Sequence, residues 1–177
     1  MKTIFKIIVL ASVISCSYAT TSINSGASFD TGFSPDGSGL QLVLKSINSA
    51  KKSIHVAAYS FTSKPIAEAL LNASKRGVDV KVVADQKSNS GKYSATTYLA
   101  NHNVPVKLNG NYTIFHHKFM VIDGISLETG SFNYSAAAAN KNAENVLTLW
   151  NVPAIAKQYD NQWNKLWSEA TPITGNY

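Results

Sequence analysis

The sequence of 177 residues predicts an α/β fold, a mixed β-sheet flanked by helices on both faces. A strand–helix–strand pattern between Ile54 and Ala84 has the length and order of two parallel strands joined by a crossover helix. Further along, two strand-like runs meet at Asp123-Gly124, a dipeptide typical of the tight turn between antiparallel strands. Parallel and antiparallel pairing together indicate a mixed sheet, and the intervening helices are expected to cover its faces.

The first half of the chain alternates between strands and helices. Continuous or alternating apolar residues predict strands, and apolar residues three or four apart predict helices. Pro65 stands at the start of a helix, where its missing N–H has no partner to lose, and Gly77 follows that helix. The expected order is a strand at 29–33, a turn at 34–39, a helix at 40–50, a strand at 54–61, a helix at 65–76 and a strand at 78–84.

The second half begins with a polar loop at 86–91 and then continues the alternation. The expected elements are a helix at 93–102, strands at 104–108, 114–122, 126–130 and 145–150, and a closing helix at 153–167. The closing helix is amphipathic, with apolar side chains on one side. No repeat or linker is visible, so we expect a single domain over residues 20–177.

The first nineteen residues have the layout of a signal peptide. Lys2 and Lys6 provide a positive start, an apolar run follows at 7–14, and the small residues of Ser17–Ala19 fit a cleavage site. We therefore expect an exported protein, periplasmic in a bacterium or secreted, with no stable membrane insertion after cleavage. Two alternatives stay open, a buried N-terminal helix and a bacterial lipoprotein box in which Cys16 becomes lipidated.

The composition excludes several classes of protein. The 45% share of hydrophobic residues argues against wholesale disorder, and a single cysteine excludes a disulfide framework or a cysteine-rich zinc module. The net charge is +6, and removal of the two lysines in the signal peptide leaves +4. A charge of this size indicates an anionic partner only weakly.

Side chains that could act in catalysis or ligand binding concentrate around the predicted hairpin. Residues two apart on a strand point to the same face, so His116 and Lys118 should project together, with His117 on the opposite face as a packing or rim residue. The hairpin should return Ser131 and Asn133 to the same end. An imidazole, an ammonium, a hydroxyl and a carboxamide suit a phosphate oxygen better than a metal, because no cysteine or paired carboxylate is available.

The spacing of these residues resembles a family signature. The pattern His-x-Lys-x4-Asp-x6-Gly-Ser-x-Asn is similar to the HKD motif of the phospholipase D superfamily, and it falls on His116, Lys118, Asp123, Gly130, Ser131 and Asn133. The short chain with one motif and a signal peptide resembles the small exported endonuclease branch, called Nuc-like. The likeness covers roughly 33–150 and includes the segments 57–61 and 142–145.

The resemblance implies a phospholipase D-like α/β/α sandwich and a reaction without metal or cofactor. Family members hydrolyse phosphodiesters through a covalent phosphohistidine, which requires a second histidine as acid and base. Because the chain carries one motif, the resemblance implies a homodimer with one His116 from each subunit. Lys118, Ser131 and Asn133 would hold the phosphate oxygens, and Glu144 would accept the Nδ1 proton of His116. Asp123 and Gly130 are expected to have supporting roles.

The expected function is a largely sequence-nonspecific endonuclease that acts on single- or double-stranded DNA, with RNA as a further candidate substrate. A phospholipase that uses the same chemistry on lipid phosphodiesters is the alternative. We rank it second because the sequence lacks a long apolar loop or a basic amphipathic helix for docking on a bilayer. A catalytically idle nucleic-acid-binding protein is disfavoured by the intact motif.

Overall fold

The structure is a computed structural model, and it describes residues 22–23, 25–91 and 94–173. The predicted signal peptide over 1–19 therefore lies outside the described residues, and so does Cys16. The described strands are β1 (Ser28–Ser34), β2 (Ser53–Ala58), β3 (Asp79–Asp85), β4 (Val106–Asn109), β5 (Lys118–Ile122), β6 (Ser126–Gly130), β7 (Glu144–Trp150) and β8 (Thr171–Pro172). The helices are α1 (Ser38–Ser49), α2 (Lys64–Lys75), α3 (Gln86–Asn89), α4 (Ala95–Asn101), α5 (Ala136–Asn140) and α6 (Pro153–Ser168).

The strands form one sheet in the order β1-β7-β6-β5-β2-β3-β4-β8. Strands β2, β3 and β4 pair in parallel, whereas β5, β6, β7 and β1 pair antiparallel, so the predicted mixed sheet is confirmed. The predicted hairpin turn is also confirmed. Asp123 and Gly124 have φ of 55° and 69°, the two positive values that a tight hairpin turn of this type needs.

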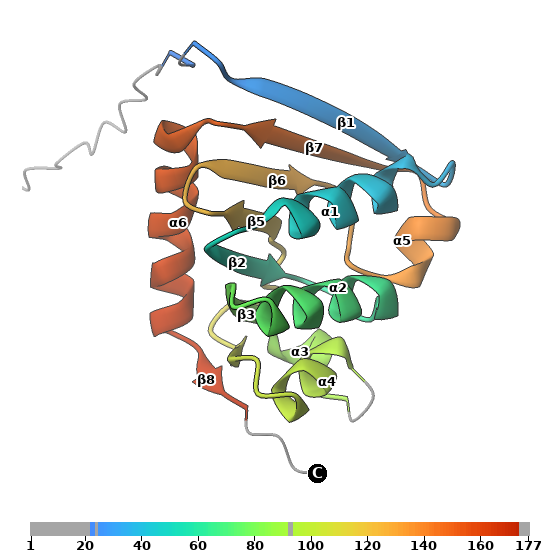
Figure 1. The fold of residues 1–177 in the computed structure, drawn as a ribbon. Coiled ribbons are helices and arrows are strands. Elements are labelled where there is room, and N and C mark those ends of the chain that lie inside the picture. The colour runs from blue at the N-terminus through green and yellow to red at the C-terminus, as the bar shows by residue number, and fades with distance from the viewer. Residues whose placement is uncertain (1–21, 24, 92–93, 174–177) are drawn as a thin grey trace, which may run out of the picture.

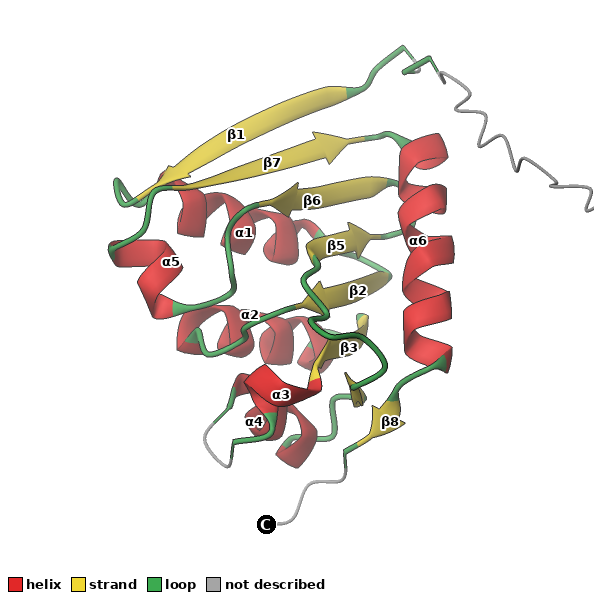
Figure 2. Cartoon of the chain, turned by 180° about the vertical axis from the view of Figure 1, so that it is seen from behind, coloured by secondary structure: helices red, strands yellow, loops and turns green. Residues whose placement is uncertain are grey.

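Helices cover both faces of the sheet, as the sequence predicted (Figure 1). Helices α1 and α2 cover one face, and the larger core cluster lies there, built from side chains such as Val43, Ile47 and Leu70. Helix α6 covers the other face, where a second cluster includes Phe119, Leu127 and Trp163 (Figure 2). None of the helices in the described part of the chain combines the length and apolar character needed to cross a membrane.

Two strand boundaries differ from the prediction at one edge of the sheet. Strand β2 ends at Ala58, not at residue 61, and β5 begins at Lys118, not at residue 114. Ala58 and Lys118 are the last paired partners of β2 and β5, and beyond this pair both segments leave the sheet. Helices α3 and α5 and strand β8 were not predicted, because each is five residues or shorter.

Candidate active site

The predicted site residues gather at the edge where β2 and β3 end, β5 begins, β6 ends and β7 begins. In a sheet with parallel strands, the carboxyl ends are the usual position of binding sites. His116 lies in the loop before β5, Lys118 is the first residue of that strand, and Ser131 follows the last residue of β6. The antiparallel pairing of β5 with β6 therefore places both parts of the motif at one edge.

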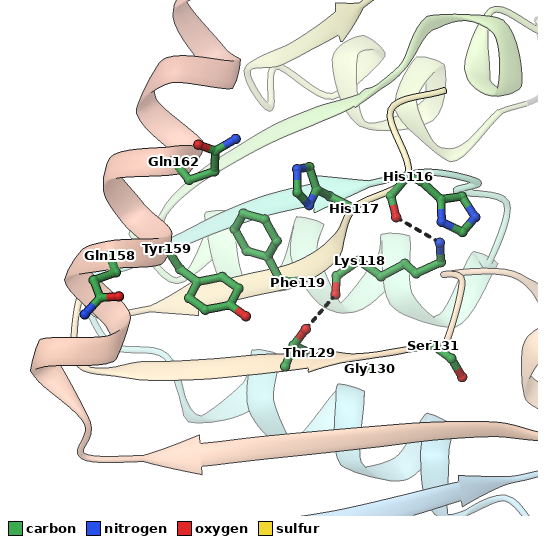
Figure 3. A pocket seen from close by; sticks show the side chains of 10 residues that line it. All are labelled: His116, His117, Lys118, Phe119, Thr129, Gly130, Ser131, Gln158, Tyr159 and Gln162. Atoms are coloured by element: carbon green, nitrogen blue, oxygen red, sulfur yellow. Dashed lines mark hydrogen bonds between the residues drawn. The ribbon is translucent and has the colours of Figure 1, made fainter. Parts of the chain in front are cut away.

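His116 and Lys118 lie against the ring of Tyr59, which follows β2. The His116 and Tyr59 ring centroids are 4.8 Å apart, and the Lys118 ammonium lies 5.2 Å from the centre of the Tyr59 ring. Lys118 Nζ donates to the carbonyl oxygen of His116 (3.0 Å), and the Thr129 hydroxyl donates to the carbonyl oxygen of Lys118 (3.2 Å; Figure 3). The lysine is 9% exposed, and this burial lowers the pKa of its ammonium, partly offset by the charge of Glu144.

His117 points toward helix α6 (Figure 3). Its imidazole lies edge-on between Phe115 and Phe119, with ring centroids 5.4 and 5.5 Å away. Burial lowers the pKa of His117, and the neighbouring Lys118 and His116 lower it further. The two adjacent histidines therefore occupy different environments.

An open cavity of about 540 Å³ joins the motif to helix α6. His116, Lys118 and Ser131 line one end, and Gln158, Tyr159 and Gln162 of α6 line the other (Figure 3). His117, Phe119, Thr129 and Gly130 form the wall between these ends. The cavity thus offers an open approach to the His116 and Lys118 side chains of the motif.

The loop after β6 is fixed by alternating buried side chains. Phe132 and Tyr134 are 1% and 0% exposed, whereas Ser131 is exposed and Asn133 is partly exposed. The Asn133 side-chain oxygen is buried and has no hydrogen-bond partner within the described residues. Gly130 is required by packing, because a Cβ there would lie 2.2 Å from the carbonyl oxygen of Asn145 in β7.

Glu144 does not make the contact that the resemblance implied. Its carboxylate accepts hydrogen bonds from the Ser131 hydroxyl (2.6 Å) and from Asn142 Nδ2 (2.9 Å), and no hydrogen bond to His116 is formed among the described residues. The carboxylate is engaged instead by side chains of the loops that follow β6 and precede β7. Within one chain, Glu144 reaches the site through Ser131 and through its charge on Lys118.

Asp123 lies at the opposite end of β5 from the other motif residues. Its carboxylate accepts hydrogen bonds from the backbone N–H groups of Lys51, Lys52 and Ser53, at 2.7 to 3.1 Å. These contacts fasten the hairpin turn to the segment between α1 and β2. The structure therefore separates Asp123 from the cluster around His116, although both belong to one sequence pattern.

Asp85, the last residue of β3, fixes the backbone beside His116 and was missed by the sequence analysis. It is 2% exposed, and its carboxylate accepts the N–H groups of Phe115 (2.9 Å) and Ser88 (2.7 Å). Burial opposes ionisation of this carboxyl, but the Phe115 and Ser88 hydrogen bonds outweigh burial and hold its pKa below the ordinary value. Its place at the end of a parallel strand was the available signal.

Asn89 also fixes backbone beside His116, on the side of the segment that follows β2. It is 1% exposed, accepts the Phe61 N–H (2.9 Å) and donates to the carbonyl oxygens of Tyr59 (2.6 Å) and Asp85 (2.8 Å). Asn89 therefore links Tyr59 to Asp85, the residue that holds the loop before His116. No spacing rule connects these positions, so sequence reasoning could not pair them.

We expect replacement of Asp85 by alanine to reduce kcat for phosphodiester cleavage about 100-fold with little change in KM, because a misplacement of about 1 Å can have this effect. Steady-state kinetics would measure it. Asp85→Asn keeps one side-chain acceptor oxygen, so its kcat should lie between those of the wild type and Asp85→Ala. Asp79→Ala, an exposed change at the far end of β3, is the matched control. A wild-type kcat in Asp85→Ala would show that the Phe115 N–H contact does not position His116.

Comparison with known proteins identifies the family. Residues 43–167 match the family described as "Cardiolipin synthase, PLD-like domain". The chain is 33% identical to a phospholipase D of Rickettsia conorii over 133 residues, which cover 75% of the chain and 66% of that protein. It is 33% identical over 128 residues to a mitochondrial cardiolipin hydrolase of Xenopus laevis, covering 72% of the chain and 60% of that protein. The chain thus spans somewhat less than two thirds of these relatives.

Solved structures give a more complete match. Nuc from Salmonella typhimurium, a phospholipase D family member, superposes with a TM-score of 0.82 and 42% identity, covering 84% of this chain and 99% of that one. NucT from Helicobacter pylori superposes with a TM-score of 0.75 and 27% identity, covering 83% and 99%. These findings confirm the resemblance read from the motif. The chain belongs to the phospholipase D superfamily, in its Nuc-like branch.

Proposed function

We propose that the protein is a metal-independent, largely sequence-nonspecific endonuclease that hydrolyses phosphodiester bonds of DNA, and of RNA as a further candidate, at a site shared by two subunits. The observation that carries this proposal is the single set of His116, Lys118 and Ser131 in one chain, lining an open cavity. Phosphodiester hydrolysis through a phosphohistidine needs two imidazoles, one on each side of phosphorus. A second copy of the chain would supply the other His116.

The proposed reaction has two steps. A neutral nitrogen of one His116 attacks phosphorus, a P–N bond forms, and the P–O bond to the leaving nucleoside breaks. The partner's protonated His116 gives its proton to the departing oxygen. The partner's imidazole, now neutral, then takes a proton from water. The resulting hydroxide forms a new P–O bond as the P–N bond breaks, which returns both histidines to their starting states.

The other motif residues would hold the phosphate. Lys118 and the Ser131 hydroxyl lie at the same end of the cavity as His116, where they would contact the non-bridging oxygens and stabilise the charge of the pentavalent state. Asn133 would add its carboxamide. Glu144 would act by orienting Ser131 and by supporting the charged form of Lys118, in keeping with its contacts inside one chain.

A phospholipase remains the second candidate. The names of relatives from Rickettsia and Xenopus, phospholipase D and mitochondrial cardiolipin hydrolase, favour a lipid phosphodiester. The nuclease is placed first because of the likeness to the small endonuclease branch and the match along almost the whole length of Nuc and NucT. Both candidates use the same atoms of the site and differ in what surrounds the phosphate.

The proposal is tested by incubating the purified protein with plasmid DNA in excess EDTA, and separately with cardiolipin vesicles. We expect DNA cleavage to persist in EDTA and to weaken steadily as salt rises, because recognition through phosphates releases counterions. Loss of cleavage in EDTA would contradict the metal-free mechanism. Hydrolysis of cardiolipin with the plasmid left intact would favour the phospholipase.

A further inference from the structure

A tyrosine outside the motif contacts two of the motif side chains. The ring centroids of Tyr59 and His116 are 4.8 Å apart with a tilt of 52°, a separation at which aromatic pairs attract. The Lys118 ammonium lies 5.2 Å from the centre of the Tyr59 ring, within the range of about 6 Å for a cation–π contact. Lys118 Nζ also donates to the backbone carbonyl oxygen of His116 (Figure 3). The three residues therefore contact one another pairwise.

The Lys118 ammonium has few other partners. The residue is 9% exposed, so water solvates little of its charge. An ammonium has several donors, and the hydrogen bond that Nζ forms within the described residues is the one to the His116 carbonyl oxygen. None of the ion pairs in the described part of the chain involves Lys118. The face of the Tyr59 ring therefore supplies negative charge density that this cation otherwise lacks.

The ring and a more distant carboxylate support the same charge. Burial lowers the pKa of Lys118, because a cation is poorly solvated in a protein interior, and the charge of Glu144 opposes this. The Glu144 carboxylate is engaged by Ser131 and Asn142, so it acts on Lys118 without touching it. The negative face of an aromatic ring also favours the charged form of a cation that it contacts. Direct support for the ammonium thus comes from Tyr59.

The backbone that carries the ring is held on both sides. Ala58 is the last residue of β2 and pairs directly with Lys118 of β5, which places Tyr59 beside the start of that strand. The Tyr59 carbonyl oxygen accepts a hydrogen bond from Asn89 Nδ2 (2.6 Å), and Asn89 Oδ1 accepts the N–H of Phe61 (2.9 Å). Asn89 and Phe61 are 1% and 0% exposed. A ring on a segment fixed in this way can position a flexible lysine side chain.

We propose that Tyr59 is a positioning residue of the phosphodiesterase site, whose ring holds the Lys118 ammonium and the His116 imidazole together where they meet the phosphate. This role rests on the phosphodiester chemistry proposed above, and it applies to a nucleic-acid diester and a lipid diester alike. A lysine side chain has several rotatable bonds. Fixing it before the reaction removes a reorganisation cost that the site would otherwise meet as charge grows in the pentavalent state.

The ring, and not the hydroxyl, is expected to carry this role. Both contacts with the motif are made by the ring, whereas the hydrogen bond that Tyr59 forms among the described residues uses its backbone carbonyl oxygen. An aliphatic side chain of similar size could replace a residue that only fills space. It could not replace a ring that acts through the charge distribution of its face.

The test compares Tyr59→Leu, which removes the ring, with Tyr59→Phe, which keeps it. Steady-state cleavage is measured on plasmid DNA and on bis-p-nitrophenyl phosphate, a diester with neither a nucleobase nor a lipid chain. We expect kcat to fall at least about tenfold in Tyr59→Leu and to stay within about twofold of the wild type in Tyr59→Phe. Tyr98→Leu is the matched control, because Tyr98 packs on His102 with ring centroids 4.4 Å apart and a tilt of 45°, and neither residue lines the cavity of the motif.

A second series separates the charge distribution of the ring from its shape. Tyr59 is replaced by phenylalanine that carries successive ring fluorines, which weaken the negative face of the ring and leave its shape almost unchanged. We expect log kcat to fall steadily with each added fluorine, while the circular dichroism spectrum and the melting temperature stay constant. A flat series would overturn the proposal, because packing alone would then explain the position of the ring.

The outcomes separate this inference from the proposed function. Full activity of Tyr59→Leu on plasmid DNA would overturn the role of Tyr59 and leave the endonuclease standing. A wild type that cleaves bis-p-nitrophenyl phosphate but not plasmid DNA, with a tenfold loss in Tyr59→Leu, would contradict the endonuclease and support the role of Tyr59. A loss in Tyr59→Phe equal to that in Tyr59→Leu would assign the effect to the hydroxyl and overturn the inference.

Discussion

Replacement of His116 by alanine is expected to reduce the rate of phosphodiester cleavage by roughly four orders of magnitude or more, because it removes both the nucleophile and the acid–base partner. The His116 side chain is exposed, so the variant should fold and bind substrate as the wild type does. Single-turnover cleavage of plasmid DNA with enzyme in excess would measure the chemical step. Appreciable cleavage by His116→Ala would end the phosphohistidine mechanism for this chain.

The neighbouring histidine supplies the control. His117 is adjacent in sequence, but its ring lies between Phe115 and Phe119 and faces helix α6. We expect His117→Ala to stay within about tenfold of wild-type activity, because this side chain lines the cavity wall and does not lie beside Lys118. Equal losses in the two variants would mean that the assignment of one histidine to chemistry is wrong.

The same variant also tests whether the site is shared. If each site needs His116 from both subunits, the active fraction in a freely exchanging mixture is the square of the wild-type fraction. An equal mixture of wild type and His116→Ala should then retain about one quarter of the activity. Retention of one half would indicate that each chain works alone.

Much of the fold could be predicted because its signals are local. The hairpin depends on Asp123 and Gly124 adopting positive φ, and β6 begins where predicted because it directly follows that turn. The boundaries that failed depend on partners distant in sequence. Strand β5 starts at Lys118 because Ala58 is the last residue of β2 beside it, and the loop before it is held by Asp85. No periodicity in residues 114–117 carries that information.

The residues of the candidate site also divide into those that local spacing predicts and those that depend on partners distant in sequence. The spacing of the motif predicted that His116, Lys118 and Ser131 lie together, because a hairpin of this length brings the two parts of the motif to the same end. Tyr59 and Asp85 approach the site from the ends of β2 and β3, so their part depends on the order of strands in the sheet. The expected Glu144 contact with His116 is not formed among the described residues, because the carboxylate is engaged by Ser131 and Asn142.

A buried carboxyl group on β6 makes the stability of the fold depend on pH. Glu128 is 1% exposed and accepts a hydrogen bond from the Tyr134 hydroxyl (2.7 Å), a residue that is itself fully buried. Burial raises the pKa of Glu128 to about 8, although the Tyr134 hydrogen bond opposes the rise. In the unfolded chain this carboxyl ionises near its ordinary value of 4.5.

Between these two pKa values the folded protein holds one proton more than the unfolded chain. The free energy of unfolding should therefore fall as pH rises from about 4.5 toward 8, by at most about 1.4 kcal/mol per pH unit. At pH 7 this amounts to as much as roughly 3 kcal/mol of stability lost relative to pH 4.5. The stability that depends on protonated Glu128 is fully present below pH 4.5 and is lost above pH 8.

Glu128→Gln removes the titration and keeps an acceptor for Tyr134. The buried amide changes the stability by an amount independent of pH, so the diagnostic quantity is the slope and not the absolute value. Denaturant unfolding at several pH values should show the wild type losing stability relative to Glu128→Gln between pH 5 and 8, with parallel curves above that range. Glu68→Gln, which changes an exposed carboxyl paired with Lys64 on α2, should keep the wild-type slope. Parallel curves for wild type and Glu128→Gln from pH 5 to 8 would mean that the folded protein ionises Glu128 as readily as the unfolded chain does, against the effect of its burial.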